Sequence, residues 1–496
     1  MKNLTRRSFV TLAAAPALAQ AADRVERWGV WELAVNGPAE GNPFVDVSFG
    51  AVFAGGARHI EVGGFYDGGG VYRLRFSPDT QGEWTYQTRS NRPELNGKTG
   101  RFVCAAPSKV NHGPVVVRNQ HHFAYADGTP YFPFGTTCYA WTHQGDALEE
   151  QTLRTLAAAP FNKMRMCIFP KSYAYNVNEP VYYPFARDAA GKSGFAHPNP
   201  EFFAHIERRI TGLQRLGMEA DLILFHPYDR WGYQDMGAAA DDRYLRYVIA
   251  RLASFRNVWW SMANEYNFLK KKTRADWERL AGILNAEDPY RRLASIHNGG
   301  ELENMYDHSK SWITHVSLQS SQLDQGAALR NRFGKPVLYD ECKYEGNIPK
   351  RWGDISAREL VRRFWMGTAQ GCYVGHGETY MDPEDVLWWS KGGVLRGESP
   401  RRIGFLRRIL EETAEEGFAP LDSYYPCSGV PGKYYLYYFD VHQPVSFAPD
   451  LPAGKFSAEL IDPWEMTVSV LGRDFERGAE VKLPGRPHLA LRVRRL

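Results

Sequence analysis

Residues 258–265, Val-Trp-Trp-Ser-Met-Ala-Asn-Glu, form a short apolar run that ends in two polar side chains. Amphipathic stretches at 241–255 and 273–285 flank this run. The same alternation of short apolar runs and longer amphipathic stretches continues through residues 131–412. It predicts parallel strands joined by crossover helices, because parallel neighbours need a connection long enough to hold a helix.

Eight strands are expected in this region, at 131–140, 162–169, 219–226, 258–263, 294–298, 314–319, 337–341 and 372–377. Helices are expected at 148–158, 200–216, 241–255, 273–285, 325–333, 356–370 and 401–410. The connection between the fifth and sixth strands is short and shows no clear helix. Eight such units over about 280 residues fit a (β/α)8 TIM barrel. An open doubly wound sheet would show the same alternation, but no strand-linked G-x-G-x-x-G or G-x-x-x-x-G-K-[ST] motif supports it.

Both flanks of the predicted barrel have the period-2 pattern of β-strands. Residues 24–110, with strands expected near 26–32, 45–49, 71–76, 84–88 and 100–103, predict an N-terminal immunoglobulin-like β-sandwich. Residues 111–130 are expected to be a linker that contains a hairpin. Residues 421–496, with strands expected at 433–439, 456–461 and 489–493, predict a small C-terminal β-sandwich.

The first 22 residues resemble an export signal. Arg6-Arg7 precedes a small apolar run at 11–19, and Ala19 and Ala21 are small residues suited to signal peptidase. The adjacent arginines favour the twin-arginine route, with a Sec signal or an uncleaved anchor as alternatives. The run is shorter than a transmembrane helix of roughly 20 residues, and no later run is long enough. We therefore expect a periplasmic or extracellular mature protein without a membrane span.

Composition argues against several kinds of partner. The net charge is +4 over 496 residues and the basic residues are scattered, so nucleic acid is not an expected partner. The six cysteines include no C-x-x-C or Cys/His cluster with zinc-site spacing, and neither a metal nor another cofactor is expected. Cysteines in the predicted strands are expected to be small buried residues, although an exported protein could also form disulfides.

Two glutamates end predicted strands on one face of the barrel. Glu265 follows the fourth strand and Glu341 ends the seventh, and such carboxyl ends carry the functional residues of TIM barrels. Glycoside hydrolysis needs a carboxylate pair, one to protonate the leaving oxygen and one to attack the anomeric carbon or activate water. A lone strand-end glutamate more often caps a helix or forms an ion pair. Asp340 competes with Glu341, but strand alternation should point the two to opposite faces.

The Asn264-Glu265 pair and Glu341 resemble the large retaining glycosidase clan with (β/α)8 barrels. That resemblance implies that Glu265 is the acid/base, that Glu341 is the nucleophile, and that Asn264 binds the sugar 2-hydroxyl. Arg165 resembles the clan's strand-two arginine, which supports the nucleophile electrostatically. The clan often has an aromatic residue or His at the end of strand six. Here that strand ends in Gln319, so the usual neighbour of the nucleophile is unassigned.

A closer likeness covers nearly the whole mature chain. Residues 28–32 (WGVWE) and 64–68 (GFYDG) are similar to the β-sandwich that precedes apiosidase-like barrels, and 132–137 (FPFGTT) is similar to their entry strand. The C-terminal sandwich fits the same three-part arrangement. The resemblance implies a bacterial carbohydrate-degrading protein and does not identify the sugar.

Several other strand-end residues are candidates for substrate binding, each with a buried structural role as the alternative. They are His226 after strand three, His297 on strand five, Tyr139 and Trp141 after strand one, and Trp388 and Trp389 after strand eight. Of the adjacent tryptophans, one is expected in the core. The predicted function is retaining hydrolysis of O-glycosidic bonds in plant or microbial polysaccharides or oligosaccharides. The alternatives are a carbohydrate-binding protein with a disabled barrel and a serine esterase, which would need a G-x-S-x-G motif that is absent.

Overall fold

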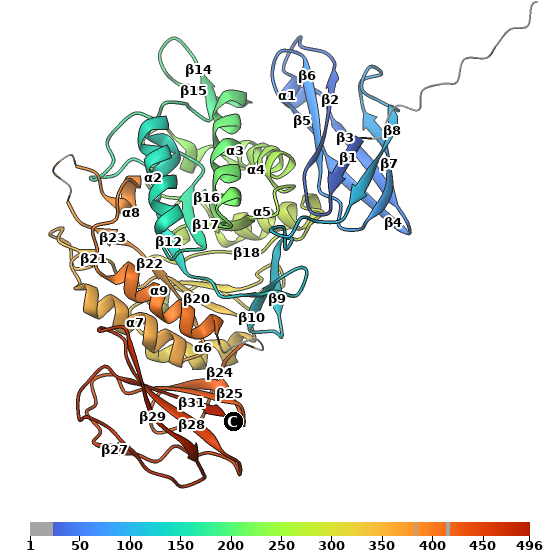
Figure 1. The fold of residues 1–496 in the computed structure, drawn as a ribbon. Coiled ribbons are helices and arrows are strands. Elements are labelled where there is room, and N and C mark those ends of the chain that lie inside the picture. The colour runs from blue at the N-terminus through green and yellow to red at the C-terminus, as the bar shows by residue number, and fades with distance from the viewer. Residues whose placement is uncertain (1–22, 382, 384, 413–416) are drawn as a thin grey trace, which may run out of the picture.

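The computed structural model describes residues 23–381, 383, 385–412 and 417–496. They form a central barrel between two sheet-rich domains (Figure 1), as the sequence predicts. The expected export signal, residues 1–22, lies outside the described residues. Within the described ranges, no helix is long and apolar enough to cross a membrane.

The N-terminal domain consists of two sheets that enclose an aromatic core. One sheet contains β1 (Asp23–Glu26), β8 (Thr99–Ala105), β7 (Gly82–Ser90), β3 (Phe49–Gly55) and β4 (Arg58–Gly63), and the other contains β2 (Trp31–Asn36), β6 (Val71–Phe76) and β5 (Phe65–Tyr66). Trp31 and Phe102 stack with ring centroids 4.7 Å apart, and Phe53 and Phe76 stack at 4.1 Å. The strand expected at 45–49 is wrong: the short helix α1 (Pro43–Asp46) takes the start of this stretch and β3 begins only at Phe49. Pro43 stands where proline favours a helix start.

The barrel contains eight strands, and all their pairings are parallel. In ladder order they are β18 (Ala294–Ser295), β17 (Val258–Ala263), β16 (Glu219–Phe225), β13 (Lys163–Cys167), β12 (Gly135–Thr137), β22 (Tyr373–His376), β20 (Val337–Glu341) and β19 (Val316–Gln319). Between β18 and β19, Thr314 N donates to Ala294 O at 2.8 Å and Ser295 Oγ to His315 O at 2.6 Å. Separate hydrogen bonds, in place of a continuous strand ladder, therefore close the barrel between β18 and β19.

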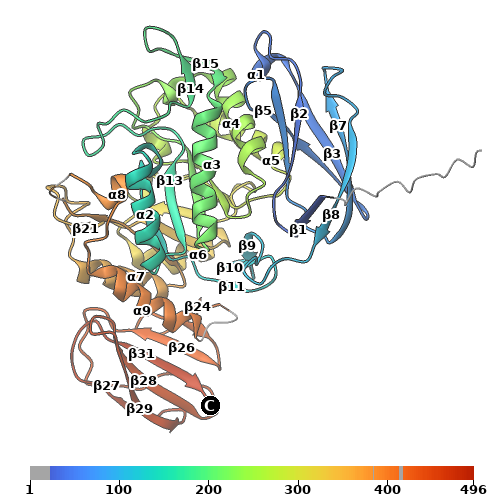
Figure 2. The ribbon, with the colours of Figure 1, turned by 45° about the horizontal axis from the view of Figure 1, so that its top comes forward.

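Seven helices surround the strands (Figure 2) and match the predicted ones to within a few residues. They are α2 (Asp146–Ala158), α3 (Pro200–Arg215), α4 (Ala238–Leu252), α5 (Arg274–Glu287), α6 (Gly326–Phe333), α7 (Ala357–Ala369) and α9 (Ser399–Glu411). Between β18 and β19 the chain makes only a 3₁₀ turn, at Leu302–Asn304. The loops contain further short strands and a short helix: β14 (Phe185–Arg187), β15 (Ser193–Pro198), β21 (Glu345–Gly346), β23 (Glu378–Thr379) and α8 (Trp388–Lys391).

A small three-stranded sheet covers the N-terminal end of the barrel. It consists of β9 (Val115–Arg118), β10 (His122–Tyr125) and β11 (Pro130–Tyr131), which come from the segment between the first two domains. The ring centroid of Phe123 lies 5.3 Å from that of Trp259, 5.6 Å from Tyr373 and 5.9 Å from His315. This aromatic contact seals one end of the barrel, so the C-terminal face is the end available to a ligand.

The C-terminal domain is built on a six-stranded antiparallel sheet. Its strands are β24 (Ala419–Pro420), β25 (Cys427–Val430), β26 (Tyr434–Tyr438), β31 (Ala490–Arg495), β28 (Phe456–Asp462) and β29 (Thr467–Phe475), with the pair β27 (Ser446–Phe447) and β30 (Val481–Lys482) beside it. Arg362 of α7 holds Asp440 through two contacts of 2.6 and 2.9 Å. The Arg402 guanidinium of α9 lies 3.4 Å from the Trp464 ring centroid. These contacts attach the domain to the barrel helices.

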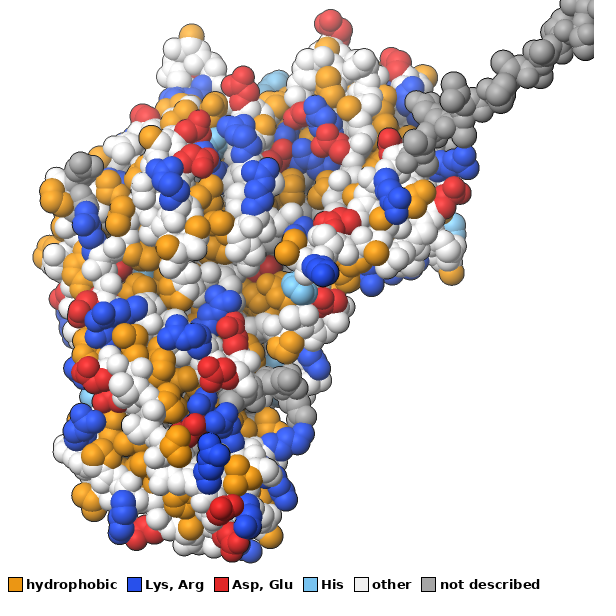
Figure 3. Space-filling view, in the orientation of Figure 1, with side chains coloured by type: hydrophobic (Ala, Val, Ile, Leu, Met, Phe, Trp, Pro, Cys, Tyr) orange, Lys and Arg blue, Asp and Glu red, His pale blue; other side chains and the backbone are white. Residues whose placement is uncertain are grey.

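The distribution of charged side chains on the surface and the burial of the cysteines agree with what the composition predicts. On the face that Figure 3 presents, Lys and Arg side chains are interspersed with Asp and Glu over all three domains. All six cysteines are buried and free, as expected of small core residues.

Candidate active site

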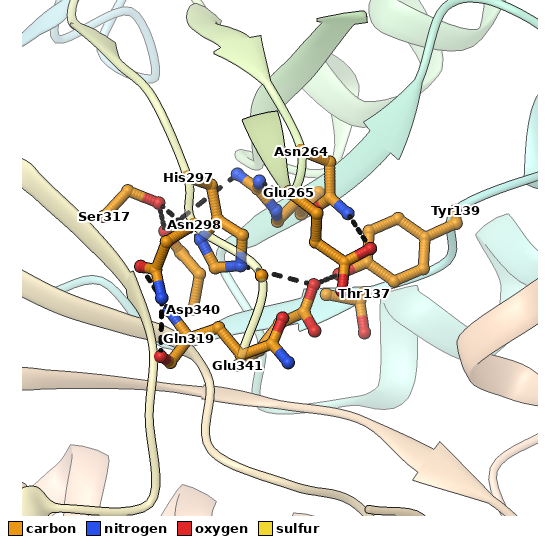
Figure 4. Close-up of polar contacts among 12 residues, drawn as sticks. Thr137, Tyr139, Asn264, Glu265, His297, Asn298, Ser317, Gln319, Asp340 and Glu341 are labelled. Atoms are coloured by element: carbon orange, nitrogen blue, oxygen red, sulfur yellow. Dashed lines mark hydrogen bonds and ion pairs between the residues drawn. The ribbon is translucent and has the colours of Figure 1, made fainter. Parts of the chain in front are cut away.

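Glu265 and Glu341 face each other at the C-terminal end of the barrel (Figure 4). Gln319, the last residue of β19, bridges them: with its amide turned so that the nitrogen faces the glutamates, this nitrogen lies 3.1 Å from Glu265 Oε1 and 3.2 Å from Glu341 Oε2. This orientation is the favourable one, since the reverse would set the amide oxygen against acceptor oxygens of both side chains. The distance between Glu265 Oε1 and Glu341 Oε2 therefore cannot exceed the sum of these two distances.

Glu265 occupies a strained and buried position. Its backbone is left-handed, with φ 49° and ψ 50°, a conformation that non-glycine residues adopt mainly where the surrounding structure imposes it. The Tyr228 hydroxyl and, at 3.3 Å, the Asn264 amide donate to Glu265 Oε2. Burial, together with the negative charge of Glu341, raises the pKa of Glu265 to about 7. Glu265 is thus the member of the pair that retains a proton near neutral pH.

Glu341 has the opposite environment. The Tyr139 hydroxyl donates to Glu341 Oε1, and His297 Nε2 lies 3.5 Å from the same oxygen. Burial favours the neutral acid, but the interactions with His297 and Tyr139 and the charge of Arg165 outweigh burial and hold the pKa of Glu341 well below its usual range. Tyr139, which follows β12, and His297, which follows β18, therefore provide the hydroxyl and imidazole neighbours that the end of β19 lacks.

A layer of paired charges fills the barrel interior next to this site. Lys163 Nζ lies 2.6 Å from Asp221 Oδ2 and 2.8 Å from Asp340 Oδ1. Arg165 contacts Asp221 at 3.3 Å and donates to Asn264 Oδ1 at 3.1 Å. Arg165 is therefore buried beneath the cavity and acts on the site by orienting Asn264 and by its charge.

The expectation that Asp340 and Glu341 point to opposite faces is wrong. Leu318 pairs with Tyr339, but the next residue, Gln319, pairs with Glu341, so the register skips Asp340. This bulge turns both carboxylates inward, with Asp340 in the paired layer and Glu341 in the cavity. Bulges next to active sites re-aim side chains in this way.

A cavity of about 200 Å³ opens above the two glutamates. Of the candidates from sequence, Tyr139, Asn264, Trp389 and both glutamates line it. Further lining residues come from loops: Lys171, Tyr173, Tyr228, Lys343, Tyr344 and Trp352. Three of them had a signal in the sequence. The Tyr-, Asn- and Pro-rich segment 171–200 after the second predicted strand predicts a loop that shapes the pocket and includes Lys171 and Tyr173, and Tyr228 stands two residues after the candidate His226.

Five candidates from sequence do not line the cavity: Arg165 and His297, whose contacts are given above, and Trp141, His226 and Trp388. The buried indoles of Trp141 and Trp388 donate to Glu149 O at 3.1 Å and to Thr136 Oγ1 at 2.8 Å. His226 Nε2 lies 3.0 Å from Phe169 O, and its Nδ1 accepts from the backbone N–H of Tyr228 at 3.2 Å. His226 therefore supports the loop that carries Tyr228, and of the adjacent tryptophans Trp388 is in the core and Trp389 in the cavity.

The described residues include two groups of His and carboxylate side chains close enough to hold a metal ion, and neither lines the cavity. In one, Glu378 accepts Gly397 N–H at 2.8 Å and Glu345 accepts Glu398 N–H at 2.7 Å, so both carboxylates cap the start of α9. In the other, Glu149 already pairs with Arg209. Both groups have structural roles that account for their acidic residues.

The catalytic-domain model of the apiosidase-like family matches residues 117–393, more than half of the chain. The chain belongs to the apiosidase-like family. Two domains of unknown function flank this match in the apiosidase-like chain, DUF5060 at residues 24–91 and DUF5605 at 424–494. The three-part resemblance predicted from sequence is thereby confirmed.

Solved structures agree with this assignment. A putative glycoside hydrolase from Bacteroides vulgatus is 40% identical, covers 96% of this apiosidase-like chain and 100% of its own, and superposes with a TM-score of 0.90. A family 5 glycoside hydrolase from Bacteroides vulgatus, 14% identical over 77% of this chain and 94% of its own, shares the fold with a TM-score of 0.60. No curated protein matches the chain. Family and structure together place this enzyme among the glycoside hydrolases.

Proposed function

We propose that this apiosidase-like enzyme hydrolyses O-glycosidic bonds with retention of configuration, with Glu341 as nucleophile and Glu265 as acid/base. The supporting observation is the Gln319 bridge, whose contacts of 3.1 and 3.2 Å limit the distance between one oxygen of each glutamate, Glu265 Oε1 and Glu341 Oε2. Retaining pairs lie about 5–5.5 Å apart and inverting pairs about 6.5–9.5 Å, because an inverting enzyme must fit a water between substrate and base. A single side chain that reaches one oxygen of each carboxyl group supports the shorter, retaining spacing.

The opposite pKa shifts suit two successive displacements. Glu341, held ionised, attacks the anomeric carbon while the Glu265 proton moves to the leaving oxygen and the glycosidic bond breaks. The resulting glycosyl ester removes the negative charge of Glu341, so the pKa of Glu265 falls. Glu265 can then take a proton from water, whose oxygen attacks the anomeric carbon and releases Glu341.

Neighbouring residues orient the sugar in this proposal. Asn264 stands between Arg165 and Glu265 and lines the cavity, where it can reach the 2-hydroxyl. Trp389 presents an indole to the same cavity for stacking on a sugar ring. The substrate would be a polysaccharide or oligosaccharide of plant or microbial origin.

The decisive experiment follows the anomeric configuration of the first-formed product by proton NMR, after a panel of nitrophenyl glycosides and polysaccharides has identified a substrate. Retention is expected, together with loss of turnover in Glu341→Gln and normal turnover in Glu61→Gln, which changes an exposed glutamate of the N-terminal domain. An inverted product would overturn the mechanism. Undiminished activity of Glu341→Gln would overturn the nucleophile assignment, and binding without hydrolysis would favour a carbohydrate-binding protein.

We also propose that the protein is exported to the periplasm or beyond by the twin-arginine route, on the basis of Arg6-Arg7 and the apolar run that follows. Cell fractionation tests this. Replacing both arginines with lysine should retain the chain in the cytoplasm, whereas unchanged export would contradict the proposed route.

A further inference from the structure

Lys171 is a buried cation inside the catalytic cavity. It follows β13 on the C-terminal face, and its relative exposure is only 3%. Its ammonium nitrogen lies 4.1 Å from the ring centroid of Tyr139, 4.5 Å from Tyr228 and 4.6 Å from Trp389. Aromatic faces therefore surround the charge, and two of them belong to the tyrosines that hold the catalytic glutamates.

The ammonium group has no counter-ion in the part of the chain that the structure describes. No carboxylate there lies within ion-pair distance of Lys171 Nζ, whereas Lys163, equally buried, contacts both Asp221 and Asp340. A buried ammonium is unfavourable unless it is paired, and the attraction of aromatic faces offsets only part of the cost. Consistent with this, burial lowers the pKa of Lys171. Glu265 and Glu341 attract this charge from beyond ion-pair distance, so an anion in direct contact with the ammonium group has to come from a ligand in the cavity.

We propose that Lys171 binds a carboxylate of the substrate, so that the enzyme cleaves glycosides of acidic sugars such as uronic acids. This inference rests on the proposed glycosidase function and specifies its substrate class. An ammonium group pairs most strongly with an anion that accepts its hydrogen bonds, and a neutral hydroxyl would leave Lys171 without an ion-pair partner in direct contact. Because Tyr139 and Tyr228 contact both Lys171 and the catalytic glutamates, the carboxylate belongs to a sugar at the cleaved bond.

The test compares uronic-acid polysaccharides and oligosaccharides with the same materials after chemical reduction of their carboxyl groups to primary alcohols. The reduction removes the charge and leaves the glycosidic linkages in place. The wild type should cleave at least one native material about 10- to 100-fold faster than its reduced form, the range expected for a hydrogen bond to a charged group. Equal or faster cleavage of the reduced form would overturn the inference.

Variants connect this preference to Lys171. Lys171→Met should lose the preference by slowing cleavage of the acidic substrate, Lys171→Arg should keep part of it, and Lys98→Met, at an exposed lysine of the N-terminal domain, should keep all of it. Circular dichroism and thermal unfolding verify that each variant is folded. A preference that persists in a folded Lys171→Met protein would contradict the assignment.

A binding measurement separates failure of this inference from failure of the proposed function. Calorimetry with Glu341→Gln should show tighter binding of native than of carboxyl-reduced oligosaccharides, and Glu341→Gln/Lys171→Met should abolish the difference. If carboxylate-dependent binding occurs but the wild type never cleaves the material, the proposed hydrolysis fails and the Lys171 site stands. If hydrolysis of neutral glycosides occurs without carboxylate-dependent binding, the Lys171 inference fails and the proposed hydrolysis stands. If the protein neither binds nor cleaves any acidic material, the Lys171 inference also fails.

Discussion

The barrel carries two neighbouring groups of buried charges that differ in how they are neutralised. In the interior layer, Lys163 and Arg165 pair with Asp221 and Asp340. In the cavity, the glutamates contact tyrosine hydroxyls and the Gln319 amide, and Lys171 contacts aromatic faces. The interior layer is complete without a ligand, so its role is structural. The glutamates and Lys171 instead line the space in which a substrate would bind, and we therefore assign these charges a functional role.

The largest expected effect concerns the proton donor of the cavity. Glu265→Ala should lower kcat/KM for glycosides with poor leaving groups by about 10²- to 10⁴-fold, because no group then protonates the departing oxygen. Nitrophenyl glycosides, whose leaving groups need less protonation, should lose less in the first step. Steady-state kinetics with matched leaving groups measures the difference, and equal losses for both substrates would contradict the acid/base role.

The next prediction contrasts the two buried lysines. Lys163→Met should lower the free energy of unfolding by about 3–5 kcal/mol, since it leaves two buried carboxylates with Arg165 as the one remaining cation within ion-pair distance among the described residues. Lys171→Met should not destabilise the protein, because it removes a charge that has no counter-ion among the described residues. Urea unfolding of both variants checks this. Similar losses of stability would remove the distinction between the two layers.

The interior layer also predicts an acid dependence of stability. The charges of Lys163 and Arg165 overcome the effect of burial and depress the pKa of Asp340 far below its usual range. A depressed carboxyl pKa contributes stability that is present above the unfolded-state value of about 3.9 and is lost as pH falls toward the folded-state value. Lys163→Met should weaken this acid dependence, and a loss of the same steepness in both proteins would argue against it.

A smaller effect separates the two tyrosines of the cavity. Tyr139→Phe and Tyr228→Phe should each lower kcat/KM about 10- to 100-fold, because each removes a hydrogen bond to a carboxylate. Loss of Tyr139 raises the pKa of Glu341 and should move the acid limb of the pH–rate profile upward. Loss of Tyr228 raises the pKa of Glu265 and should move the alkaline limb upward. Shifts of the same limb in both variants would contradict the assigned roles.

The mildest prediction is the pH profile of the wild type. Activity of the free enzyme should fall as pH rises through about 7, where Glu265 loses its proton, and should persist well into the acid range because the pKa of Glu341 is low. The profile of kcat/KM reports these values. A profile that rises through neutral pH would reverse the two roles.

Much of the fold was predictable because each barrel strand is a short apolar run and each helix has a separate amphipathic pattern. The same logic predicted Glu265 and Glu341, since residues at strand ends share one face of a barrel. It failed where backbone geometry departs from regularity. The helix at Pro43–Asp46 replaced an expected strand, and the bulge at Asp340 turned two adjacent carboxylates inward.

The sequence by itself determined the eight-stranded barrel, its two flanking domains and the position of Glu265 and Glu341 on one face of the barrel, because these follow from local periodicity and from position at strand ends. Only the tertiary structure decided which polar groups meet. Tyr139 follows β12, His297 follows β18 and Gln319 ends β19, and all three lie against Glu341. Lys171 lies among aromatic side chains that come from separate loops. Such contacts join residues far apart in the chain, and their geometry depends on how the whole barrel packs, which no local pattern records.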